Sequence, residues 1–218
     1  VPPDTSSTNS SRPPRYPART SDRFSARETG PMNTFARDLR RGDCQHPTNL
    51  QLLGDPLGFI HEDHLRERHI CATLDKLAAD EPPSRADLDD ARDFLGTELP
   101  LHIADEEEDL FPLLRRRCTR EDEIDRVIAR LQDDHAHADF DTPAVTALVS
   151  DAPEDLDEAG RDALQRYANH ARRHLILETA IVLPFARLRL TRRDLETLRL
   201  RMMQRRGIGG PADANALP

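Results

Sequence analysis

The chain has 218 residues, of which 37% are hydrophobic, 4% aromatic and 33% charged, and its formal net charge is −9. This length allows one ordinary domain with tails, and the shortage of aromatic residues favours packed helices over a sheet. The acidic balance argues against a nucleic-acid partner, and no apolar stretch reaches the roughly 18–20 residues of a membrane-spanning helix. We therefore expect a soluble all-α protein.

Residues 1–45 are rich in Pro, Ser, Thr and Arg and have no hydrophobic period. Such a segment cannot bury enough apolar surface to offset its ordering entropy, so we predict a disordered basic tail. It also lacks the apolar core of a secretory signal. The three cysteines, Cys44, Cys71 and Cys118, form no CxxC motif and are typical of reduced thiols, which favours a cytoplasmic location.

Four long helices are predicted after this tail. Each follows a capping residue, and the four caps are Asp55, Ser84, Thr119 and Asp151. The helices are expected at 56–79, 85–117, 120–140 and 152–189. Their connections are short, and short connections make consecutive helices antiparallel neighbours. The predicted fold class is therefore all-α, an up-down-up-down four-helix bundle over residues 55–190.

An additional C-terminal helix is predicted at 191–206. Leu195, Leu198 and Met202 recur there at helical spacing. We expect this accessory helix to pack outside the bundle. The remaining residues, 207–218, are predicted to form a disordered tail.

Three prolines interrupt the predicted helices. Pro100 lacks a backbone donor and its ring presses on the carbonyl group of Gly96, which predicts a kink or a break there. Pro112 and Pro184 should likewise bend or end their helices.

Every helix of the bundle carries a histidine where its inward stripe needs an apolar residue. Residues spaced 3, 4 and 7 apart share one face of a helix, and this rule places on the stripes His64, His102, His135 and His174. Glu106 and Glu178 each follow a stripe histidine by four residues, in the similar segments "HIADEEEDLFP" and "HLILETAIVLP". Buried polar groups are costly unless they are paired or coordinated, and a mixed His/carboxylate set suits iron, manganese or zinc. We predict a metal site.

The two halves of the bundle repeat each other. His64 precedes His102 by 38 residues, and His135 precedes His174 by 39. Each half therefore offers two histidines and one glutamate around an approximate two-fold axis. This pattern predicts a symmetric two-metal site with coordination positions left open for water, dioxygen or nitric oxide.

These segments, together with "EDH" at 62–64 and "DDH" at 133–135, resemble the hemerythrin-like proteins with an HHE cation-binding domain. The resemblance implies a four-helix bundle around a non-haem di-iron centre, with two iron ions that are oxo- or hydroxo-bridged. It implies the following ligands, with the two glutamates bridging: His64, His102, Glu106, His135, His174 and Glu178.

The ligand set separates this chain from the oxygen-carrying hemerythrins. Asp139 and Thr179 stand where those proteins have a further histidine and an aspartate. The set of four histidines and two glutamates is similar to that of di-iron proteins associated with iron-sulfur cluster repair and with nitric oxide or oxygen sensing. The tail at 1–45 does not resemble the cysteine-bearing domain of the repair proteins.

The expected function is to bind or sense a small diatomic ligand or peroxide at this centre. No catalytic base beyond the ligands can be named. Two alternatives stay open: a helical interaction module with a structural metal and a protein partner, or a di-iron enzyme in peroxide or nitric oxide detoxification or iron-centre repair.

Two other families of metal site fit less well. "HEDH" at 61–64 spaces its histidines three apart, whereas a zinc-protease helix needs a spacing of four. Ferritin-like bundles place Glu three residues before His, whereas here each Glu comes four residues after.

Several polar residues near the stripes have less certain roles. His61 and His170 are candidates for extra ligands or for hydrogen-bonding neighbours of the ligands, and Asp109 for a hydrogen bond to a ligand imidazole. Glu107 and Glu108 rotate away from His102 and are expected on a solvated face, and Asp105 is expected to have no role at the site.

Overall fold

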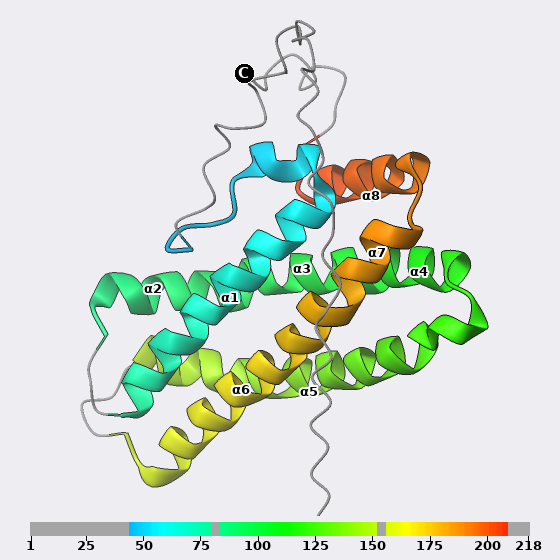
Figure 1. Ribbon diagram of the computed structural model, residues 1–218. Helices are drawn as coiled ribbons and strands as arrows, with labels where there is room; N and C mark the ends of the chain where they lie inside the picture. The colour runs from blue at the N-terminus through cyan, green and yellow to red at the C-terminus, as the bar shows by residue number, and fades with distance from the viewer. Residues whose placement is uncertain (1–43, 80–82, 152–155, 209–218) are drawn as a thin grey trace, which may run out of the picture. The chain divides into compact units, whose positions relative to one another are not determined.

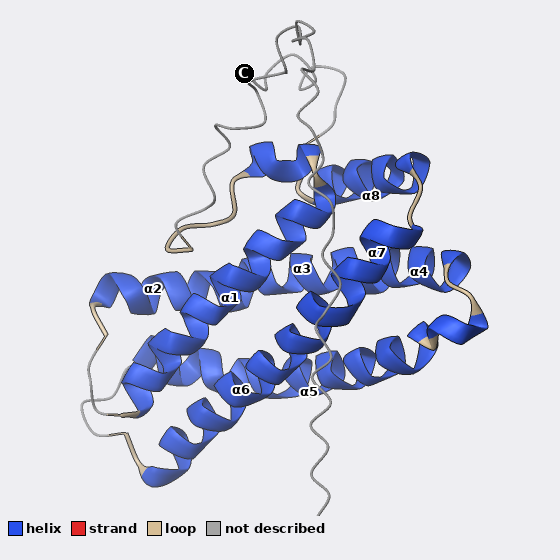
Figure 2. Ribbon diagram, viewed as in Figure 1, coloured by secondary structure: helices blue, strands red, loops and turns tan. Residues whose placement is uncertain are grey.

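The computed structural model describes residues 44–79, 83–151 and 156–208, and all regular elements in these ranges are helical (Figure 2). The first long helix is α1 (Pro56–Ala78), which the short 3-10 helix η2 (Leu50–Gly54) precedes. The second run comprises α2 (Arg85–Asp93), η3 (Phe94–Glu98), α3 (Leu99–Asp105), η4 (Glu106–Leu110) and α4 (Phe111–Arg117). Then come η5 (Arg120–Asp122), α5 (Ile124–Asp151), α6 (Glu158–Leu177), η6 (Glu178–Val182), α7 (Leu183–Arg189) and α8 (Arg192–Arg205).

These elements form a bundle of four helical runs (Figure 1). Consecutive runs travel in opposite directions, and α1 packs along α6 while α5 contacts α2, α4 and α6. The prediction of an all-α bundle is therefore confirmed. The predicted tails fall almost wholly on residues 1–43 and 209–218, which lie outside the described residues.

The helix starts follow the predicted caps in most places. The Asp55 carboxylate accepts a hydrogen bond from the Gly58 N–H group at 3.1 Å, and Ser84 forms a capping box with Asp87. The predicted cap at Thr119 closes only the single turn η5. Glu123 then adopts a left-handed conformation with φ of 49°, and the long helix α5 begins at the next residue, Ile124.

The boundary between α5 and α6 differs from the predicted one. The third helix was expected to end at 140, but α5 continues through Pro143 to Asp151. Val145 and Val149 are buried in the core, and this packing stabilises the added turns. The start predicted at 152 lies outside the described residues. The helix that follows is capped by Asp157, which accepts from the Gly160 N–H group at 2.8 Å.

Each of the three prolines follows a wide π-helical turn. The turns η3, η4 and η6 close with N–H groups that donate to the fifth carbonyl group back, such as Phe111 to Glu106 and Leu183 to Glu178. The wider turn accommodates a proline ring that would clash in a regular α-helix. The helical path therefore continues past Pro112 and Pro184, so neither proline ends its helical run, and the predicted bend at these prolines stays a prediction.

The buried apolar side chains form two clusters. Along α1, Ile60 belongs to the first cluster and Ile70 to the second, and His64 lies between them. The same order recurs on α5, where His135 lies between Leu131 and Val145. The histidines thus form a polar layer between two apolar ones.

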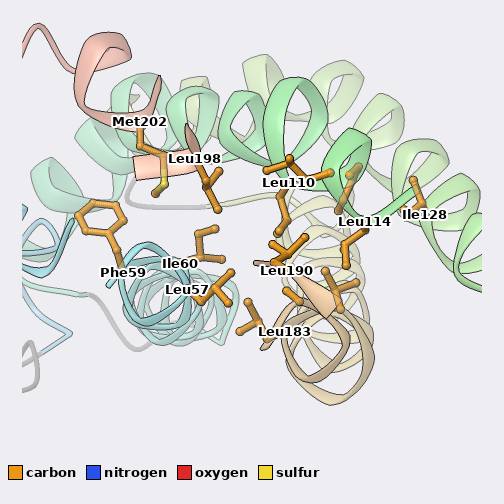
Figure 3. Packing of buried hydrophobic residues seen from close by; sticks show 14 of the residues in the cluster. Leu57, Phe59, Ile60, Leu110, Leu114, Ile128, Leu183, Leu190, Leu198 and Met202 are labelled. Carbon is orange, nitrogen blue, oxygen red and sulfur yellow. The ribbon is translucent and has the colours of Figure 1, made fainter. Parts of the chain in front are cut away.

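The C-terminal helix α8 closes the first cluster. Leu198 and Met202 are fully buried there, and Figure 3 shows both side chains directed toward the same core as Ile60 and Leu110. The helix is additional to the four helical runs, as predicted, and it packs against them through this apolar stripe. Its apolar stripe was recognised, but the periodicity alone does not identify the surface that it covers.

Asp194 anchors the start of α8, so its loss should be costly. Its carboxylate accepts from the Thr191 N–H group at 2.9 Å and from Arg117 at 2.8 Å, although it is only 4% exposed. We expect Asp194→Ala to lower the free energy of unfolding by about 1–3 kcal/mol, because a helix cap and a charged hydrogen bond are both lost. Urea denaturation would measure this. Asp162→Ala, at an exposed position, should change it by less than about 0.5 kcal/mol, and an equal loss in both variants would contradict the assignment.

Candidate metal centre

The six predicted ligand residues come together from four helical runs. The histidines lie on α1 (His64), α3 (His102), α5 (His135) and α6 (His174), and the glutamates open the π turns η4 (Glu106) and η6 (Glu178). None of the six is more than 6% exposed. The backbone N–H group of each glutamate donates to the carbonyl group of the histidine four residues before it. Both His–Glu pairs therefore keep the regular helical spacing that places them on one face.

Their potential ligand atoms form two overlapping groups. Within each group all of these atoms lie within 4.8 Å of one another. One group consists of His64, His102, Glu106 and Glu178, and the other of Glu106, His135, His174 and Glu178. The two carboxylates belong to both groups, as carboxylates that bridge two cations would.

In the first group the histidine Nε2 atoms face the carboxylates. His64 Nε2 lies 3.2 Å from Glu178 Oε2 and 3.7 Å from Glu106 Oε1. His102 Nε2 lies 3.7 Å from Glu106 Oε2. Both glutamates thus approach His64 from other helical runs, and Glu106 also lies near His102 of its own run.

The second group repeats this arrangement. His174 Nε2 lies 3.0 Å from Glu178 Oε1, and His135 Nε2 lies 3.5 Å from Glu106 Oε2. The Nε2 atoms of His135 and His174 are 3.1 Å apart. The convergence of these nitrogen atoms gives each half of the centre two imidazole donors.

A cation fits the chemistry of this layer. Both side-chain oxygens of Glu106 and of Glu178 are buried without a hydrogen-bond partner among the described residues, as is Nε2 of His64 and of His102. Unpaired buried polar atoms of this kind cost about 1–3 kcal/mol each. Burial and the neighbouring Glu106 carboxylate raise the pKa of Glu178 well above its ordinary value, because two adjacent carboxylates in an apolar site cannot both be charged unless cations compensate them.

The outward nitrogens of two histidines face aspartates. Asp63 Oδ2 lies 3.5 Å from His102 Nδ1, and Asp134 Oδ2 lies 3.7 Å from His174 Nδ1. Each aspartate directly precedes the first histidine of its half and serves the second. At these distances neither Nδ1 atom has a hydrogen-bond partner among the described residues, so the aspartates act on the two rings through their charge, which raises the basicity of an imidazole.

The other two histidines have partners that differ in charge. Glu107 Oε1 lies 2.7 Å from His135 Nδ1, whereas His64 Nδ1 has the hydroxyl group of Thr179 at 3.3 Å. Burial lowers the pKa of His64 to about 4. Burial also lowers that of His135, but Glu106, Glu178 and Glu107 outweigh this effect and raise it to about 9.

The expectation that Glu107 lies on a solvated face was therefore wrong. Its rotation of about 140° from His102 carries it away from the stripe of its own helix. The same rotation directs it to His135 on α5, which a pattern within one helix cannot reveal. A spacing argument across the repeat would have helped, since Glu107 and Thr179 both follow a predicted ligand.

Two neighbouring acids pair with arginines. Asp105 stands outside both ligand groups, as expected; it is fully buried and forms ion pairs with Arg205 and Arg206, the latter at 2.7 Å. The expectation that Asp109 bonds an imidazole was wrong, because it pairs instead with Arg205 at 2.7 Å and with Arg201 at 3.2 Å. Both acids hold α8 against the bundle. The sequence did not predict where α8 packs.

The other histidines near the site stand outside both ligand groups. His61 is only half-buried on α1. His170 Nε2 lies 3.5 Å from Asp134 Oδ1, so it is a neighbour of the residue that faces His174. His137 is exposed, and its Nδ1 lies 2.6 Å from the Asp133 carbonyl oxygen of its own helix.

A small cavity adjoins the centre. Its volume open to the centre of a water molecule is about 20 Å³, and it is lined by His102, His135 and His174 together with apolar side chains such as Leu99 and Ala171. A single water needs about 10–15 Å³ by this measure. The cavity therefore has room for a molecule of very few atoms beside three of the imidazoles.

Glu67 also lines this cavity and was missed in the sequence. It is 8% exposed, and burial raises its pKa. Its position three residues after His64, on the stripe that continues to Cys71, was the signal that could have found it.

A sequence model of the hemerythrin HHE cation-binding domain matches residues 55–186. The chain belongs to this family. The resemblance inferred from the sequence motifs is thus confirmed. The match to the HHE domain ends within α7, so α8 lies beyond it.

The HHE assignment and the geometry agree on a coarse function. The family is one of cation-binding domains, and the two His/Glu groups of this chain could hold metal. A comparison with curated proteins finds no match to this HHE protein. Among the described residues, no helix combines the length and the apolar character needed to cross a bilayer.

Proposed function

We propose that this HHE protein is a non-haem di-iron protein that binds or senses dioxygen, nitric oxide or peroxide. The observation that carries the proposal is the pair of ligand groups that share the Glu106 and Glu178 carboxylates. Two iron ions held there would supply redox chemistry and a coordination position open to a small ligand. His64 and His102 would hold one ion, and His135 and His174 the other.

The side chains around the ions have separable roles. Glu107 orients the His135 ring through its contact of 2.7 Å to Nδ1. Asp63 and Asp134 lie 3.5 and 3.7 Å from Nδ1 of His102 and His174 and act on these rings through their charge. The apolar clusters on both sides keep water away from the centre. This arrangement favours reversible binding of a ligand over turnover of a large substrate, because the adjoining cavity has space for only a few atoms.

The cavity favours a ligand-binding centre over a purely structural metal. A structural site is closed, whereas this one is bordered by a space that three of the four candidate ligand imidazoles line. We propose that the physiological ligand occupies this space.

Filling the cavity should weaken ligand binding without removing metal. Ala138 lines the cavity, and Ala136 on the same helix is exposed. We expect Ala138→Leu to weaken azide binding to the iron-loaded protein at least about tenfold, since the added side chain occupies the ligand's space. Optical titration with azide would measure this.

Ala136→Leu is the matched control and should leave azide affinity and iron content unchanged. If Ala138→Leu binds azide as tightly as the unaltered chain while its iron content is equal, the cavity is not the ligand site.

A further inference from the structure

The two halves of the centre match in their first pair of outer contacts. Asp63 serves His102 at 3.5 Å, and Asp134 serves His174 at 3.7 Å. Each aspartate also has an arginine nearby: Arg206 lies 4.0 Å from Asp63, and Arg130 on α5 lies 3.1 Å from Asp134. These contacts therefore do not distinguish the two metal positions.

The second pair of outer contacts breaks the symmetry. The residue after each shared glutamate reaches the first histidine of the opposite half. On one side this residue is Glu107, whose carboxylate lies 2.7 Å from His135 Nδ1. On the other it is Thr179, whose hydroxyl oxygen lies 3.3 Å from His64 Nδ1. One imidazole has an anionic partner at short distance, and its counterpart has a neutral partner at longer distance.

Glu107 is held in place for this contact. Gln132 on α5 donates to its other oxygen at 2.6 Å, and Glu107 makes no ion pair with arginine or lysine within the described ranges. Its negative charge therefore acts on His135 and is not neutralised by an arginine or lysine of the described ranges. A carboxylate partner makes an imidazole a stronger electron donor, and removal of such partners typically costs about 10–100-fold in metal affinity.

We infer that the two metal positions are unequal and that the position formed by His135 and His174 binds its ion more tightly, with Glu107 as the positioning residue responsible. This inference rests on the proposed function, since it concerns the same centre. It also gives the protein an order of loading: the first ion occupies the His135–His174 position, and the second completes the centre beside His64 and His102.

The test uses variants that each keep one position. His102→Gln leaves the His135–His174 position intact, and His174→Gln leaves the His64–His102 position intact. We expect the first variant to bind iron(II) about 10–100-fold more tightly than the second, as measured by calorimetric titration under nitrogen. The corresponding alanine variants provide a second pair if a glutamine variant fails to fold.

Glu107→Gln added to each variant identifies the cause. With His102→Gln it should abolish the advantage, and with His174→Gln it should leave the affinity unchanged, because Glu107 serves the other position. Equal affinities of the two single-position variants, or an equal effect of Glu107→Gln on both, would overturn the inference alone. Failure of the unaltered chain to bind iron would overturn the proposed function and this inference together.

Discussion

Glu178→Gln is expected to remove both iron ions from the protein, although it changes a single side chain. Glu178 belongs to both ligand groups, so each position loses a charged donor when its carboxylate becomes an amide. His102→Ala removes a donor from only one group and should leave about one ion per chain. Iron analysis after anaerobic reconstitution and desalting would distinguish these outcomes.

His137→Ala is the control for this prediction. His137 is exposed and its ring lies against a carbonyl group of its own helix, so its removal should leave the iron content unchanged. Retention of both ions in Glu178→Gln would contradict the shared role of this carboxylate. Loss of iron in His137→Ala would show that the register of α5 differs from the one described.

Iron binding should stabilise the folded chain strongly. At free iron about 1,000-fold above the dissociation constant of a site, linkage adds about 4 kcal/mol per bound ion to the free energy of unfolding. For a chain of this size that corresponds to a rise in Tm of roughly 8–16 °C. Calorimetry of the loaded and chelated protein would measure it, and circular dichroism should show that the chelated protein keeps most of its helices because the two apolar clusters remain.

In the metal-free protein, Glu178→Gln should not lower the free energy of unfolding, although the same replacement removes the iron that stabilises the loaded protein. Without a cation the buried Glu178 carboxylate is costly, so Glu178→Gln should equal or exceed the unaltered apoprotein in stability. The pKa of Glu178 is raised in the folded chain. The contribution of this group to stability is therefore fully present below its unfolded pKa of about 4.3 and is lost as the pH rises.

The advantage of the variant should accordingly vanish at low pH and grow toward neutral pH. Chemical denaturation of both apoproteins between about pH 4 and 8 tests the sign. If Glu178→Gln lowers the free energy of unfolding of the apoprotein, the buried carboxylate is not costly without a cation. If the loaded protein is no more stable than the chelated one, the His/Glu layer does not bind iron in the folded chain.

The bundle was predictable because its signals are local. Asp55 and Ser84 mark helix starts through hydrogen bonds that span only three residues, and the inward stripes follow from helical geometry. The end of α5 could not be predicted from local signals. Pro143 disfavours a helix locally, but burial of the residues after it in the core stabilises the helix through to Asp151. The π turns were not predicted either, because the clash between a proline ring and the preceding helical turn can be relieved by a kink, by a helix end or by a wider turn.

The inner residues of the site were more accessible to sequence reasoning than their partners. His102 and Glu106 lie on one face of one helix, so periodicity is enough to pair them. Glu107 and Asp105 act across helices, on α5 and α8, and their contacts depend on how those helices are placed. The outer contacts therefore required the structure.

Iron content and the optical spectrum of one reconstituted sample test the proposed di-iron centre. After anaerobic loading with iron(II), removal of free metal and exposure to air, we expect two iron ions per chain and the near-ultraviolet charge-transfer absorption of a bridged ferric pair. A colourless protein with one bound ion, or with none, would contradict it.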